Sequence, residues 1–325
     1  MKTSEKILRY IASKRQASVH ELVDYLDISR MAVSRQLANL VAEGRLIKVG
    51  KPPKVFYSLA KGNEKIKNIV EVVDSNVEKI IENNFLIITP DGQRREGMTG
   101  FVYWCEKTKQ SVGKTAKEYV DSFRKFDAFK KNGLIDGMKK FKATFEGVFL
   151  NKVFYVDFYS IERFGKTKLG QLLLYAKQSQ DKKLMKELTV EVKPKVDYLV
   201  DKYGIDGIGF IPPTVKRQVQ FMKELEKNLH ENVKKISIVK VKTEIVVPQK
   251  TLNKLEDRIE NARNTIVVDD MGKYNNILLI DDAVGSGATL NETARQMREK
   301  NMCKGKIIGL SITGSFKGFD VISEV

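Results

Sequence analysis

Two adjacent carboxylates followed by a glycine-containing turn form the stretch of the sequence whose chemistry is most specific. Asp281 and Asp282 come directly after the apolar run 276–280, which is typical of a buried parallel strand. The turn that follows consists of Gly285, Ser286, Gly287, Ala288 and Thr289. Its glycines let backbone amides approach an anion, its two hydroxyls add donors, and a helix start behind it supplies further N–H groups. The segment predicts a phosphate-binding loop.

The two acids predict a second feature of the same ligand. Carboxylates repel phosphate, but they accept hydrogen bonds from a vicinal diol, and a ribose carries its 2′- and 3′-hydroxyls close to its 5′-phosphate. Asp281 and Asp282 with the loop 285–289 therefore predict a site for ribose 5-phosphate. The segment is neither a P-loop nor a dinucleotide fingerprint. An acidic strand end that binds Mg²⁺ in another phosphotransfer fold remains an alternative.

The segment 277–289 resembles the phosphoribosyl pyrophosphate motif of type I phosphoribosyltransferases, which has four hydrophobic residues, two acids, two variable residues and a loop closed by threonine. Gly285 departs from that motif, because the family has threonine at the start of its loop. In purine-salvage members this position carries an acid that acts on the base, so the resemblance argues against that class of substrate.

Further segments are similar to the ComF subfamily of these enzymes, and with the motif they cover residues 148–325. They are 154–159, 164–170, 172–177, 207–218 and 251–262. The resemblance implies an α/β fold, with a doubly wound, mostly parallel sheet of the type I phosphoribosyltransferase kind. It also implies phosphoribosyl pyrophosphate as ligand and Mg²⁺ as cofactor, held at Asp281 and Asp282 through ribose hydroxyls or water.

Three cations are candidates for the remaining phosphates. Lys216 and Arg217 follow a di-proline turn where the family has its pyrophosphate loop, and both suit a pyrophosphate ligand. A solvated basic face is the alternative for this pair. Arg258 lies in the segment that resembles the family's flexible region, where it contacts substrate or phosphate, or else pairs with nearby glutamates on a helix surface.

The first sixty residues predict an all-α domain with a wing. Apolar residues at helical spacing mark a helix over 4–14, Ser18 and Glu21 form a capping box for a second, and Ser29 caps a third that runs to about residue 43. Two short strands, 46–49 and 55–59, flank the basic turn 50–54.

This segment resembles the winged helix-turn-helix of bacterial and archaeal transcription regulators. The resemblance implies that the third helix enters the major groove and that the turn touches the DNA backbone or the minor groove. The residues expected to contact DNA are Arg30, Ser34, Arg35, Gln36, Lys51 and Lys54. A protein–protein adaptor is the alternative, and the basic turn favours DNA.

The region 61–147 shows no recognised chemistry. Apolar residues recur at helical spacing over 64–84, which fits either a dimerisation helix or a packed connector, and paired DNA binding makes a homodimer the expectation. The aromatic run 101–105 is expected to be core. We therefore divide the chain into a DNA-binding domain (1–60), a helical connector with a small α+β region (61–147) and a phosphoribosyltransferase-like domain (148–325).

Composition adds a net charge of +17, which predicts attraction to polyanions such as DNA, although a generally lysine-rich composition has the same effect. Cys105 and Cys303 have no metal-type spacing, and His20 and His230 are the only histidines, so a disulfide framework, a zinc site and histidine-based catalysis are not expected. No segment has transmembrane length or the features of a signal sequence, and we expect a soluble cytoplasmic protein.

Three functions follow from these expectations. The first is a Mg²⁺-dependent phosphoribosyltransferase, in which a nucleophile displaces pyrophosphate from C1 of the sugar. The second is a winged-helix regulator that senses phosphoribosyl pyrophosphate without turnover, similar to the purine repressor of Gram-positive bacteria. The third is a DNA-handling or anti-phage effector of the retron type that acts on nucleotides. The sequence does not identify the acceptor.

Overall fold

The computed structural model describes residues 2–60, 73–215, 217–229, 233–241, 244–245, 247 and 249–316. The chain divides into two compact units, residues 1–71 and 72–325. Each unit is described by itself below. Among the described residues, no helix is both long and apolar enough to cross a membrane.

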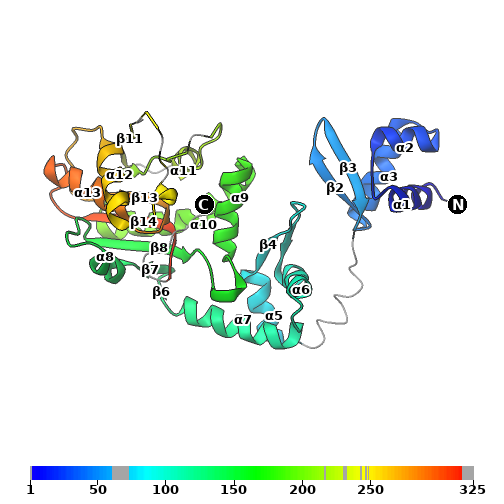
Figure 1. The fold of residues 1–325 in the computed structure, drawn as a ribbon, viewed down its shortest axis with the longest axis horizontal. Coiled ribbons are helices and arrows are strands. Elements are labelled where there is room, and N and C mark those ends of the chain that lie inside the picture. The colour runs from blue at the N-terminus through cyan, green and yellow to red at the C-terminus, as the bar shows by residue number, and fades with distance from the viewer. Residues whose placement is uncertain are drawn as a thin grey trace. The chain divides into compact units, whose positions relative to one another are not determined.

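The N-terminal unit places three helices against a small antiparallel sheet (Figure 1). Its elements are α1 (Thr3–Lys14), β1 (Gln16–Ser18), α2 (Val19–Leu26), α3 (Arg30–Ala42), β2 (Leu46–Lys51) and β3 (Lys54–Leu59). Their apolar faces form one core, built from Ile7, Ile11, Ala17, Leu22, Val33, Leu37, Leu40 and Leu46. The three predicted helices and the hairpin are confirmed.

Local signals explain where these helices begin and end. Ser18 accepts a hydrogen bond from the Glu21 amide, and the Glu21 carboxylate accepts one from the Ser18 amide at 2.6 Å, which is the predicted capping box. Ser29 caps α3 by accepting from the Ala32 amide. The strands β2 and β3 are longer than expected, so the turn between them consists of only two prolines. The strand β1, which pairs with β3, was not expected.

The second unit is built around a larger sheet. Its elements are α5 (Ser75–Asn84), β4 (Leu86–Ile88), β5 (Arg94–Glu96), α6 (Gly97–Thr108), α7 (Val112–Asp127), β6 (Lys130–Lys131), β7 (Leu134–Asp136), α8 (Met138–Thr144), β8 (Lys152–Phe158), η1 (Glu162–Phe164), α9 (Lys168–Ser179), α10 (Lys182–Tyr203), β9 (Gly207–Phe210), α11 (Phe221–Leu229), β10 (Lys234–Ile236), β11 (Ile238–Lys240), η2 (Gln249–Thr251), α12 (Leu255–Thr265), β12 (Ile266–Val268), β13 (Ile277–Val284), α13 (Ala288–Glu299) and β14 (Ile307–Gly314).

Within the described residues the sheet has seven strands in the order β10-β9-β13-β14-β8-β7-β6. The strands from β10 to β8 run parallel, and β7 and β6 are antiparallel additions at one edge. The expected mixed α/β architecture with a mostly parallel sheet is therefore present. Strands β6 and β7 precede residue 148 in the sequence, yet they belong to the same sheet as β8.

Helices cover both faces of this sheet (Figure 1). Alternate residues of β13 enter separate cores, because successive side chains of a strand point to opposite faces. Ile277 and Leu279 pack with residues of α8, α12 and α13. Leu278 and Ile280 pack with residues of α9, α10 and α11. The second unit is thus a three-layer structure with a buried central strand.

The order of the strands marks one place in the sheet as a binding crevice. The chain leaves β9 through α11 toward β10, and it leaves β13 through α13 toward β14, in the opposite direction along the sheet. The crevice between two such connections lies outside the carboxyl ends of the strands, where ligands bind in open α/β sheets.

The region 75–127 packs around an aromatic cluster of its own. Phe101 and Cys105 of α6 are fully buried, and the Phe101 ring contacts those of Phe85, Trp104 and Tyr119. Phe101, Val102 and Cys105 of the aromatic run are therefore core, as expected, whereas Tyr103 and Trp104 are partly buried. Of the predicted helix over 64–84, α5 forms the last part, and residues 61–72 lie outside the described residues.

Candidate functional site

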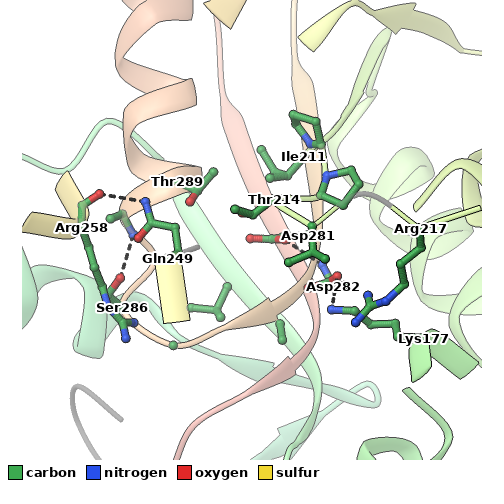
Figure 2. A pocket seen from close by; sticks show the side chains of 18 residues that line it. Lys177, Ile211, Thr214, Arg217, Gln249, Arg258, Asp281, Asp282, Ser286 and Thr289 are labelled. Carbon is green, nitrogen blue, oxygen red and sulfur yellow. Dashed lines mark hydrogen bonds and ion pairs between the residues drawn. The ribbon is translucent and has the colours of Figure 1, made fainter. Parts of the chain in front are cut away.

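A cavity opens at the carboxyl ends of β9 and β13, in the crevice that the strand order marks (Figure 2). Its walls come from the end of β13, the start of α13, the loop after β9, and single residues of α9, η2 and α12. The predicted residues that line it are Asp281, Asp282, Gly285, Ser286, Gly287, Ala288, Thr289, Arg217 and Arg258. The structure thus brings together segments that lie far apart in the sequence, from Lys177 to Thr289.

Asp281 and Asp282 point in different directions at the end of the sheet (Figure 2). β13 was expected to end before the acids, but it continues through them to Val284. The Asp282 carboxylate is directed toward α9, where it pairs with Lys177. One link remains between them, since the Asp282 amide donates to Asp281 Oδ1 at 2.8 Å.

Lys177 of α9 is the partner of Asp282. Its Nζ lies 2.7 Å from Asp282 Oδ2, and its side chain is only 10% exposed. Lys177 is the last residue of the segment 172–177, which resembles the ComF subfamily, and no role was predicted for it. Only its place in the helix could have indicated a special role for Lys177. It is a charged residue among apolar residues of α9, such as Leu173 and Ala176, that are buried.

Asp281 lies in a different electrostatic setting. Burial, and then the nearby Asp282 carboxylate, raise the pKa of Asp281 well above its usual range. Lys177 and, to a smaller extent, Lys240 at the end of β11 act against that rise. Burial lowers the pKa of Lys240, and Asp281 acts against that shift. The Lys240 ammonium donates to Thr214 Oγ1 at 3.1 Å, which ties β11 to the loop after β9.

The loop 285–289 follows the end of β13 and runs into the start of α13. Gly287 has φ +85°, a left-handed conformation that favours glycine, and it directly precedes α13. The N-cap residue, Gly287, has no side chain that could cap α13, and the residues at this helix start line the cavity. Ser286 is buried, and its Oγ accepts from the Ala288 amide at 3.3 Å. The helix begins at Ala288, inside the predicted loop rather than behind it.

Arg217 and Arg258 reach the cavity from different sides. Arg217 lies beside Asp282 and Lys177 in Figure 2, whereas Arg258 lies with Gln249 and Ser286 at the opposite side. Arg258 is 4% exposed and its Nε donates to the Leu252 carbonyl at 2.8 Å, a position unlike that of an exposed helix-surface ion. Lys216 lies outside the described residues.

The predicted DNA-contacting surface belongs to the N-terminal unit. Arg30, Ser34 and Arg35 are exposed on α3, and Gln36 is partly buried. In the wing, β2 and β3 pair up to the turn, where Lys51 is opposite Lys54. Lys54 is exposed, and the side chain of Lys51 is outside the described part of the structure.

Comparison with known proteins identifies this unit. Residues 4–50 match the DeoR-like helix-turn-helix domain family. This stretch contains α1, α2, α3 and most of β2, and a helix-turn-helix domain of this kind indicates DNA as a partner. No curated protein matches the sequence. The N-terminal unit thus contains a DeoR-like helix-turn-helix domain over residues 4–50.

Proposed function

We propose that this chain is a DNA-binding protein whose α/β unit binds phosphoribosyl pyrophosphate. One observation carries the proposal. The acids Asp281 and Asp282 and the glycine loop 285–289 line one cavity, and that cavity lies at the switch point of a mostly parallel sheet. A diol acceptor and a phosphate cradle on one continuous segment match the two ends of ribose 5-phosphate.

The remaining cations fit the second anionic group of this ligand. Arg217 lies on the side of the acids away from Ser286 and the loop (Figure 2). A 5′-phosphate in the loop and hydroxyls at the acids would direct the substituent at C1 toward Arg217. A guanidinium makes paired hydrogen bonds with phosphate oxygens, which suits the diphosphate of phosphoribosyl pyrophosphate.

Mg²⁺ fits this site only together with the ligand. Among the described residues, no three His, Cys, Asp or Glu side chains gather to hold a metal ion. Asp282 is already paired with Lys177, and Asp281 is half-buried. Asp281 and Asp282 would therefore hold Mg²⁺ through ribose hydroxyls or water. Bound in this way, Mg²⁺ would neutralise charge on the diphosphate.

In the enzymatic form of the proposal, a nucleophile displaces pyrophosphate from C1. The carbon gains positive character as the leaving group departs, so neutralising the leaving group matters more than a strong base. Arg217 would bind the departing diphosphate. Asp282 would hold the hydroxyls and place negative charge near the sugar ring.

Thermal unfolding with and without phosphoribosyl pyrophosphate and Mg²⁺ tests the binding step. A ligand that binds the native state raises stability by RT ln(1 + [L]/Kd), so the melting temperature should rise with ligand concentration. The double variant Asp281→Asn, Asp282→Asn should lose that rise. Asp121→Asn, an exposed acid on α7, is the matched control and should keep it. A native protein with no rise at millimolar ligand would rule out the proposal.

A regulator that senses the ligand without turnover is the second candidate, and the DeoR-like domain favours it. Two measurements separate the candidates. An enzyme releases pyrophosphate when it is offered phosphoribosyl pyrophosphate and an acceptor. A sensor releases none, and the ligand changes its affinity for a duplex selected from random DNA.

A further inference from the structure

Lys177 is a buried cation whose position calls for an explanation. It lies on α9, where its neighbours Leu173, Leu174 and Ala176 are in the core, and its own exposure is 8%. Burying an ammonium is costly unless the charge is paired. The Asp282 carboxylate at 2.7 Å provides the pairing. An ion pair that served packing alone, however, would not need to line a cavity.

The ammonium of Lys177 has donors to spare on the cavity side. A lysine carries three N–H donors. Among the described residues, this ammonium donates one hydrogen bond, to Asp282. Lys177 lines the cavity together with Arg217, and Figure 2 shows both on the side of the acids away from Ser286 and Arg258.

We propose that Lys177 is a ligand-binding residue that joins Asp282 to the second anionic group of the ligand, the diphosphate at C1 of the sugar. This inference rests on the proposed binding of phosphoribosyl pyrophosphate. Asp282 accepts from the sugar hydroxyls and from Lys177, and the remaining N–H groups of Lys177 donate to diphosphate oxygens. Lys177 thereby links the part of the site that holds the diol to the part that holds the anion.

The consequence is selectivity between two sugars. Ribose 5-phosphate contacts the loop 285–289 and the acids, but it has no group at C1 that accepts hydrogen bonds from the remaining N–H groups of Lys177. Phosphoribosyl pyrophosphate contacts the loop, the acids and Lys177. Loss of the Lys177 charge should therefore weaken the second ligand much more than the first.

The test measures the dissociation constants of ribose 5-phosphate and of phosphoribosyl pyrophosphate with Mg²⁺ by calorimetry. The readout is the ratio of the two constants, because any general disturbance of the acids affects both. Lys177→Gln should reduce the preference for the diphosphate about 10- to 100-fold, the range for a lost hydrogen bond to a charged group. Lys177→Arg, which keeps the charge, should retain most of the preference. Lys186→Met, on an exposed position of α10, should retain all of it.

The outcomes are separable. A ratio for Lys177→Gln equal to that of the native protein overturns the inference, whether or not both affinities fall, because Lys177 then acts only as the structural partner of Asp282. If Lys177→Gln does not fold, the Lys177→Arg variant provides the test. Arginine keeps the positive charge, so a loss of the preference for the diphosphate in Lys177→Arg would overturn the inference. A native protein that binds neither sugar refutes the proposed function itself.

Discussion

Gly287 packs directly against the ring of Phe141. A Cβ atom at Gly287 would lie 2.2 Å from Phe141 Cζ, so the loop and α8 meet with no room for a side chain. Phe141 is itself buried, at 1% exposure, and belongs to the core beneath α13. The backbone of the loop therefore rests on the hydrophobic core, which fixes the positions of its amides.

Gly287→Ala should damage both stability and anion binding. The left-handed backbone alone costs a residue with a Cβ about 1–2 kcal/mol. Displacing the Phe141 ring adds overpacking strain. Urea unfolding followed by the fluorescence of Trp104, the only tryptophan, measures the loss in the second unit. Gly147→Ala, where the new atom meets Phe149 at an ordinary 3.6 Å, should leave the midpoint nearly unchanged. Equal midpoints for the two variants would contradict this account.

Asp281→Asn should stabilise the second unit increasingly as the pH rises. Burial raises the pKa of Asp281 to about 8, so the folded state favours the protonated acid. In the unfolded chain the group ionises near pH 4, and each step in pH between the two values therefore favours unfolding of the native protein. Asparagine does not ionise. The difference in unfolding free energy between variant and native protein should grow from pH 5 to pH 8 and then level off.

Exposed acids provide the control for that pH dependence. Asp121→Asn should show a difference that stays flat over the same range, because Asp121 lies on the surface of α7. A flat profile for Asp281→Asn as well would mean that Asp281 ionises normally in the folded protein.

Arg94 and Glu187 should couple β5 to α10 energetically. The Arg94 guanidinium donates two hydrogen bonds to the Glu187 carboxylate, at 2.7 and 2.6 Å. Both side chains are about a third exposed, so a double-mutant cycle with alanine should give a coupling of only about 0.5–1 kcal/mol at neutral pH. Hydrogen bonding to Arg94 lowers the pKa of Glu187. The coupling should be complete above the ordinary pKa of a glutamate and should disappear as the pH falls through the lowered value. A coupling that persists at pH 2 would refute the assignment.

Arg35→Ala and Lys54→Ala should weaken DNA binding in different ways. Arg35 is exposed on α3, and loss of a base contact should cost about 1–3 kcal/mol on a selected duplex and little on random DNA. Lys54 lies at the wing, and loss of a phosphate contact should weaken both duplexes equally and lower the salt slope by about 1. Fluorescence anisotropy at several salt concentrations measures both effects. Lys6→Ala on α1 is the control. If Lys6→Ala weakened DNA binding as much as Arg35→Ala, the assignment of the DNA-binding surface to α3 and the wing would be wrong.

Local patterns predicted the N-terminal unit almost completely. The capping box at Ser18 and the cap at Ser29 act over three residues, and the apolar spacing of each helix is visible without its partners. The strand β1 was missed because it has three residues, too few for a pattern, and it exists only by pairing with β3.

The sequence predicted those parts of the site that lie within one continuous segment. The acids and the loop 285–289 are consecutive in the sequence, so their chemistry was readable there. Lys177 and Lys240 were not predicted, because only the packing of α9 and β11 at the end of β13 brings them to the acids. The continuation of β13 through both acids to Val284 was missed as well, because the apolar run ends at Ile280.

The pairing of β9 with β13 also bears on how the site comes into being during folding. Gly207 is opposite Ile277, so the two strands that carry the walls of the cavity join across a long stretch of chain. Such non-local pairing closes a large loop and is intrinsically slow. Early folding intermediates should therefore contain helices but no binding crevice. During synthesis, ligand affinity should arise only after the ribosome has released the strand that begins at Ile277.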